Sequence, residues 1–126
     1  MRALFAAVLL TVFAQGQTQK SIADRIRIEK AAAGKMRFSP VEIVAWAGAQ
    51  IHWYNTTAEP HEPGILKEDG TFVAFLEEPV AAGAASSVFS PLARIDDKGN
   101  LIPFTIHYVC GRHRNEQGSI QVIPTP

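Results

Sequence analysis

The segment from residue 104 to residue 122 most constrains how this chain can fold, because it contains the only cysteine among 126 residues. Apolar and polar residues alternate up to Cys110, so we predict a half-buried strand that ends at Cys110 with the thiol facing the core. His113 follows three residues after the cysteine, and Glu116 three residues after that. Gly118 closes the loop, and the next residues read as a second strand. A thiolate, an imidazole and a third donor on a tight loop between two strands indicate a metal site.

This spacing is weak evidence when it is taken alone. Zinc sites use the same residue types, and a buried cysteine most often acts as a small apolar core residue. The interpretation as a metal site therefore depends on a further ligand elsewhere in the chain.

Length and net charge limit the classes of protein to consider. A chain of 126 residues has room for one domain with one hydrophobic core, and we predict that single domain at residues 17–126. The formal net charge is zero, so the composition does not indicate nucleic acid or an anionic membrane as a general partner.

Residues 1–16 have the pattern of a secretory signal peptide. Arg2 precedes an apolar run of about a dozen residues, which is too short for an ordinary membrane-spanning helix. Ala14, Gln15 and Gly16 have the small-x-small form of a cleavage site. We therefore expect cleavage after Gly16 and a periplasmic or secreted protein that is not membrane-bound. The alternative is an N-terminal membrane anchor.

The cysteine count fits an exported metal protein. One cysteine cannot form a disulfide within the chain, and a free thiol in an oxidising compartment is a liability unless it pairs with another chain or has a use. Use as a metal ligand removes this liability.

The segment 38–55 is the second informative stretch. Alternating apolar residues lie on either side of a turn marked by Gly48, and they are Ile43, Ala45, Ile51 and Trp53. This pattern predicts a strand–turn–strand unit with one buried face. His52 is out of phase with these residues and is expected on the solvent side of its strand.

The remaining segments predict an all-β protein. Short alternating segments follow one another closely and show little helical periodicity, which is typical of a β-sandwich or barrel. The further predicted strands are 25–30, 70–76, 87–90, 92–95 and 101–106. The residues at 96–100 are a turn signal, and those at 31–34 fit either a turn or a short helix.

Residues 56–64 are expected to form a loop, because they include two prolines and a glycine. His61 lies inside this loop, between Glu59 and Glu62. Read by itself, His61 would be an exposed loop histidine.

The two informative stretches together resemble the cupredoxin family, the small blue-copper proteins. The first motif of that family is matched by Phe38, Pro40, Ile43, Ala45, Gly48, Ile51, Trp53 and Asn55, with a Pro-His pair at Pro60 and His61. The second motif is matched by Tyr108, Cys110, His113 and Gly118. The short ligand loop is similar to that of amicyanins, and the resemblance covers residues 36–123.

The resemblance implies a Greek-key β-sandwich or barrel that binds one copper ion per chain. The implied ligands in the trigonal plane are His61, Cys110 and His113. A thiolate with two imidazoles suits both Cu(I) and Cu(II), so little reorganisation accompanies electron transfer. The implied function is that of a one-electron carrier rather than an enzyme. Such a carrier would be a monomer that exchanges electrons with a redox partner protein through the edge of His113.

Glu116 departs from the family pattern, because it stands where the axial methionine is expected. A coordinating carboxylate would favour Cu(II), lower the reduction potential and move the colour away from blue. The alternative is that Glu116 turns outward and pairs with Arg112 or Arg114. Glu62, which follows the first histidine, is an alternative fourth ligand.

Two arginines flank the exit histidine, and they suggest an acidic docking surface on the partner. The alternative is that Arg112 and Arg114 are solvated and contact no partner. The segment 91–103 is longer than the family pattern predicts.

Two further hypotheses follow from the departures. A copper-binding protein for storage, delivery or resistance is the first, because the carboxylate of Glu116 makes fast redox cycling less certain. A zinc-binding or metal-free relative of the fold is the second.

Overall fold

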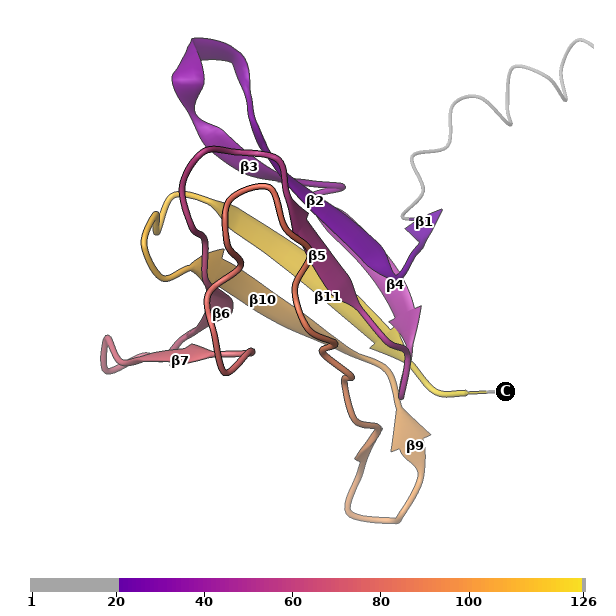
Figure 1. Ribbon diagram of the computed structural model, residues 1–126. Coiled ribbons are helices and arrows are strands. Elements are labelled where there is room, and N and C mark those ends of the chain that lie inside the picture. Colours follow the sequence, from indigo (N-terminus) through magenta and orange to yellow (C-terminus); the bar gives the residue numbers. More distant parts are fainter. Residues whose placement is uncertain (1–20, 126) are drawn as a thin grey trace, which may run out of the picture.

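The computed structural model describes residues 21–125, and in this range the regular secondary structure is β-strand apart from one short 3₁₀ turn (Figure 1). The strands are β1 (Ser21–Ile22), β2 (Arg25–Lys30), β3 (Met36–Ser39), β4 (Glu42–Trp46), β5 (His52–Asn55), β6 (Pro63–Leu66), β7 (Phe72–Ala74), β8 (Arg94–Ile95), β9 (Leu101–Ile102), β10 (Phe104–Cys110) and β11 (Gln117–Ile123). A 3₁₀ turn, Ala32–Gly34, joins β2 to β3. The predicted signal peptide, residues 1–16, lies outside the described residues. Within residues 21–125, no helix has the length and apolar character needed to cross a membrane.

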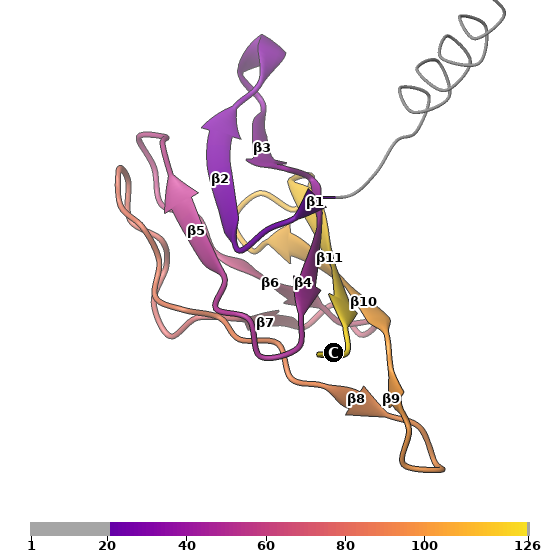
Figure 2. The same ribbon diagram turned by 90° about the vertical axis from the view of Figure 1, so that its right-hand side faces the viewer.

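The strands form two main sheets, which confirms the predicted all-β sandwich. Six strands lie in the order β1-β4-β11-β10-β6-β7, and three in the order β3-β2-β5. Figure 2 shows the three-stranded sheet as a separate layer beside the sheet that contains β4, β10 and β11. Strands β8 and β9 form a hairpin that projects from the sandwich.

The chain crosses from one sheet to the other twice near its beginning. It leaves β1 in the large sheet and enters β2 in the small one, and it returns between β3 and β4 at Pro40, whose peptide bond with Ser39 is cis. The chain crosses again between β4 and β5, so the predicted strand–turn–strand unit at 38–55 has these two strands in different sheets. Its burial pattern is nevertheless as predicted, because Ile43 and Trp53 are both fully buried.

The core between the sheets is built around three aromatic rings. The ring of Tyr108 lies 4.7 Å from that of Phe38 and 5.6 Å from that of Trp53, measured between centroids. The indole N–H of Trp53 donates to the hydroxyl of Tyr108 at 3.3 Å. Gly118 is needed opposite this hydroxyl, since a Cβ there would lie 2.6 Å from Cζ of Tyr108. Cys110 is on the same strand face as Tyr108 and is fully buried, as predicted.

The prediction of a strand at 87–90 is wrong. The chain from 80 to 89 meets β5 only at separate bridges, Tyr54 with Ala85 and Ile51 with Phe89. Between them the backbone N–H of Trp53 donates to the side-chain oxygen of Ser86 rather than to a carbonyl, so no continuous ladder forms.

The structure of the remaining segments largely agrees with the predictions made from the sequence. The predicted hairpin around residues 96–100 is confirmed, since a carboxylate oxygen of Asp96 accepts the N–H groups of Lys98 and Asn100 at 2.9 Å. The predicted strand at 70–76 is present but shorter, as β7, and residues 31–34 contain the short 3₁₀ turn.

Candidate metal centre

The pairing of β10 with β6 brings together the two segments that carry the site, one around His61 and the other around Cys110. Cys110 is opposite Pro63 in this antiparallel pair, and the N–H of Gly111 donates to the carbonyl of Glu62 at 2.8 Å. The residue before Glu62 is His61, which forms an isolated bridge with Val80. Two segments that are 49 residues apart at Cys110 and His61 are thereby held side by side.

The loop between β10 and β11 is closed by its own backbone. The carbonyl of Cys110 accepts the N–H of His113 at 3.2 Å, and the carbonyl of His113 accepts the N–H of Glu116 at 2.8 Å. The N–H of Cys110 donates to the carbonyl of Glu116 at 3.0 Å. These successive turns direct Cys110, His113 and Glu116 toward the same point.

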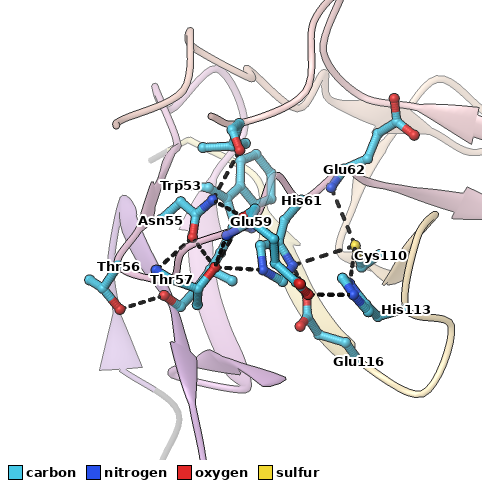
Figure 3. Close-up of polar contacts among 12 residues, drawn as sticks. Trp53, Asn55, Thr56, Thr57, Glu59, His61, Glu62, Cys110, His113 and Glu116 are labelled. Carbon is cyan, nitrogen blue, oxygen red and sulfur yellow. Dashed lines mark hydrogen bonds and ion pairs between the residues drawn. The ribbon is translucent and has the colours of Figure 1, made fainter. Parts of the chain in front are cut away.

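All four predicted ligands meet in one cluster, shown in Figure 3. One ligand atom from each of His61, Cys110, His113 and Glu116 lies within 4.8 Å of the others. The thiol sulfur is 3.7 Å from Nδ1 of His61 and 3.6 Å from Nδ1 of His113. A carboxylate oxygen of Glu116 is 3.1 Å from Nδ1 of His61.

Glu116 points into the protein, so the alternative in which it turns outward to pair with an arginine is wrong. The residue is only 2% exposed. Its second carboxylate oxygen is buried and has no hydrogen-bond partner among residues 21–125. A buried carboxylate oxygen without a donor is costly in an empty polar site and is accounted for by a bound cation.

The hydrogen bonds around His61 determine which ring nitrogen faces the cluster. The side-chain NH₂ of Asn55 donates to two carbonyls, those of Glu59 and Val80, so its oxygen is the acceptor for Thr57. The hydroxyl of Thr57 donates to that oxygen at 2.7 Å and lies 2.9 Å from Nε2 of His61. The hydroxyl oxygen then accepts the Nε2–H, which leaves the lone pair of Nδ1 free for a metal.

His113 is oriented in the same sense by a different residue. Its Nε2 lies 2.8 Å from a carboxylate oxygen of Glu59, and its Nδ1 faces the thiol. The side chain of His113 is 33% exposed, whereas that of His61 is completely buried. One ligand is therefore internal and the other reaches the surface.

Glu62 contributes its backbone rather than its carboxylate. The N–H of Glu62 donates to the sulfur of Cys110 at 3.3 Å, which stabilises a thiolate there. Its side chain points away from the cluster in Figure 3. The alternative that Glu62 is the fourth ligand is therefore wrong.

Burial opposes charge on each buried member of the cluster when no metal is present. It raises the pKa of Glu116 to about 7, with a smaller contribution from the negative charge of Glu59. Burial also raises the pKa of the Cys110 thiol and lowers the pKa of His61, to which the neighbouring His113 adds. A cation at the centre would reverse the effect on the carboxyl and the thiol, because it stabilises their anionic forms. It would further favour the neutral imidazole of His61, which is the form that binds a metal.

The residues fit a single copper ion. Three of the donor–donor distances are 3.1–3.7 Å, and these match ligands that each lie about 2.0–2.3 Å from a shared ion. One thiolate and two imidazoles with a further weak or variable donor are the ligand set of mononuclear copper sites in electron-transfer proteins. Zinc accepts the same donors, so the absorption and EPR spectra of the Cu(II)-loaded protein decide between the two metals.

Sequence reasoning missed Thr57 and the role of Glu59. Asn55 is part of the first motif, but nothing in the spacing indicates that its side chain fixes the loop that carries both residues. Their function depends on partners up to 54 residues away, as for Glu59 and His113. The proximity of Glu59 to His61 in the sequence is the one available signal.

Comparison with solved structures shows that the chain has the cupredoxin fold. Amicyanin from Paracoccus versutus superposes with a TM-score of 0.55 at 21% identity, over 86% of this chain and 87% of that one. A purple cupredoxin from Nitrosopumilus maritimus superposes with a TM-score of 0.57 at 18% identity, over 79% and 99% of the two chains. No protein-family model and no curated protein matches at the level of sequence. The fold implied by the two sequence motifs is confirmed.

Proposed function

We propose that this protein binds one copper ion through His61, Cys110 and His113, with Glu116 as a fourth ligand, and that it carries single electrons. The convergence of these four side chains, with their donor atoms within 4.8 Å of one another, is the observation that carries the proposal. Copper in such a site supplies a couple between Cu(I) and Cu(II). The names of the structural neighbours, amicyanin and purple cupredoxin, agree with it.

The residues of the chain suit a carrier because hydrogen bonds from neighbouring residues fix the proposed ligands. Asn55 and Thr57 fix His61, and the backbone of Glu62 fixes the sulfur of Cys110. A site that is already formed changes little between oxidation states, which keeps the reorganisation energy of electron transfer low. The half-exposed ring of His113 gives electrons a route to the surface.

We place the protein in the periplasm or outside the cell, as a monomer in which residues 17–126 form a single domain. The apolar leader at residues 1–16 supports export. We regard the protein as a carrier and not an enzyme, because the four proposed ligands use all the donor groups of the cluster.

We further propose a redox partner with an acidic docking surface. Arg112 and Arg114 are exposed on either side of His113, and neither forms an ion pair with a carboxylate in the described chain. Charge attraction of this kind raises the association rate and weakens with salt. The exchange of electrons with an acidic partner should therefore slow as ionic strength rises. Replacement of both arginines by alanine should remove most of that salt dependence.

A copper storage, delivery or resistance protein is the second candidate. The carboxylate of Glu116 favours it, because a hard anionic ligand stabilises Cu(II) and makes rapid cycling harder. Voltammetry of the copper-loaded protein, paired with competition by a copper chelator, separates the two functions. A carrier gives a fast reversible wave and retains its metal through many cycles. A delivery protein gives a slow or irreversible wave and transfers its copper to the chelator.

A further inference from the structure

Glu59 contacts the metal centre from outside, and no motif assigns it a role. We propose that Glu59 is a positioning residue of this centre. Its carboxylate accepts the Nε2–H of His113, which directs Nδ1 to the metal and fastens the ligand loop to the loop at 56–61. The consequence for copper rests on the proposed function, whereas the hydrogen bond itself can be tested without any metal.

The two histidines show the same arrangement with different partners. Each presents Nδ1 to the sulfur of Cys110 and Nε2 to an oxygen from a short segment before His61. For His61 the oxygen is the hydroxyl of Thr57 at 2.9 Å, and for His113 it is the carboxylate of Glu59 at 2.8 Å. Metal-binding histidines commonly donate their outer N–H to such an oxygen, which fixes the ring and strengthens the ligand.

The backbone of Glu59 is held firmly enough for this task. The carbonyl of Glu59 accepts the side-chain NH₂ of Asn55 at 2.8 Å and lies 3.0 Å from the hydroxyl of Thr57. Asn55 is itself completely buried. The carboxylate of Glu59 therefore extends from a fixed point rather than from a free loop, and Figure 3 shows it between the two ligand-bearing segments.

The solvent exposure of the pair formed by Glu59 and His113 indicates that Glu59 orients the imidazole ring more than it stabilises the fold. The side chain of Glu59 is 47% exposed and that of His113 is 33% exposed. An ion pair with this much access to water adds little to folding stability. Its value lies in geometry, since the only other hydrogen-bond contact of the His113 ring within residues 21–125 is the one with the sulfur of Cys110.

Glu59 also changes the surface that a partner meets. Its carboxylate covers the outer nitrogen of His113, the edge proposed for electron exit. A partner that docks there contacts a carboxylate next to the imidazole as well as the two neighbouring arginines.

The test compares four proteins, wild type, Glu59→Ala, Glu59→Gln and Glu68→Ala, each metal-free and loaded with Zn²⁺. Proton–nitrogen NMR at mildly alkaline pH follows the Nε2–H of His113, and a zinc titration gives the affinity. In the wild type this proton should exchange slowly with water. In Glu59→Ala it should be lost to exchange, and the affinity for Zn²⁺ should fall about tenfold.

The other two variants show whether the effect of Glu59→Ala comes from the lost hydrogen-bond acceptor, from the lost charge or from a change in folding. Glu59→Gln should retain the resonance and most of the affinity, because its amide oxygen can still accept the proton. Glu68→Ala removes an exposed charge on the turn between β6 and β7, outside the cluster, and it should behave as the wild type. Equal exchange rates in wild type and Glu59→Ala, with equal zinc affinity, would overturn the inference.

The same series distinguishes this inference from the proposed function. Slow exchange in the metal-free wild type and its loss in Glu59→Ala support the role of Glu59 even if copper does not bind at Cys110. If copper binds at the site with the same affinity in the wild type and in Glu59→Ala, only the role of Glu59 is overturned.

Discussion

The metal centre has a buried half and an outer half, and each half orients one histidine in a different environment. His61 and Glu116 lie in the buried half, where side chains are 0% and 1% exposed. His113 and Glu59 lie in the outer half, at 33% and 47%. The buried half is built into the core, so its residues affect both folding and metal binding. The outer half is fastened by one solvent-accessible pair, so its residues affect metal binding and contact with partners while the fold is largely independent of them.

The largest expected effect comes from removing each imidazole in turn. His61→Ala leaves a cavity and removes the hydrogen bond between its ring and the hydroxyl of Thr57, so the metal-free protein should lose about 2–4 kcal/mol of unfolding free energy. His113→Ala removes a half-exposed ring and should cost less than about 1 kcal/mol. Both variants should lose tight copper binding.

Urea denaturation of the two metal-free variants checks this contrast, with Glu68→Ala, a variant at an exposed residue outside the cluster, as the control. An equal loss of stability in both variants would contradict the division into a buried and an outer half.

The next effect concerns the buried carboxylate. Glu116→Met replaces a hard anionic donor with a soft neutral one, which disfavours Cu(II) relative to Cu(I). The reduction potential should rise and the thiolate-to-copper absorption should strengthen toward that of blue sites. Voltammetry and visible absorption of the loaded variant measure both quantities. If neither changes, Glu116 does not contact the metal.

A smaller effect is the pH dependence of metal affinity. The pKa of Glu116 is about 7 in the metal-free protein, above its ordinary value of 4.5, so the folded protein holds a proton on this carboxyl below about pH 7. Copper binding must release that proton, and affinity must therefore rise with pH. Glu116→Gln has no such proton to release.

Copper titrations between about pH 5 and pH 8 test this linkage. Below about pH 7 the logarithm of the affinity should rise more steeply in the wild type than in Glu116→Gln, by up to about one per pH unit. Above that pH the two slopes should converge. Identical slopes at every pH would show that Glu116 does not exchange its proton for the metal.

The sequence indicated the candidate ligands more completely than the residues that orient them. His61, Cys110, His113 and Glu116 were predicted because two short motifs in the expected order resemble those of a known fold, and the structure brings all four together. The inward orientation of Glu116 could not be predicted. An acidic residue on a loop beside two arginines is compatible with either orientation, and the backbone hydrogen bonds of the loop decide between them.

The supports and the strand crossings depend on contacts that are distant in the sequence. Thr57 and Glu59 look like ordinary loop residues until the loop is folded against the cluster. The passage of the chain between sheets in the turn from β4 to β5 leaves the alternation of buried residues unchanged, so periodicity alone could not reveal that β4 and β5 belong to different sheets. The segment 87–90 has the composition of a strand, but its pairing is interrupted by Ser86.

The most direct test of the copper centre is the visible absorption and EPR spectrum of the Cu(II)-loaded protein beside that of Cys110→Ala. An intense thiolate-to-copper band that disappears in the variant is the predicted result, and its position reports on the contribution of Glu116. A pale spectrum that is the same with and without the thiol would contradict the account. The protein would then share the fold of the cupredoxins without their copper site.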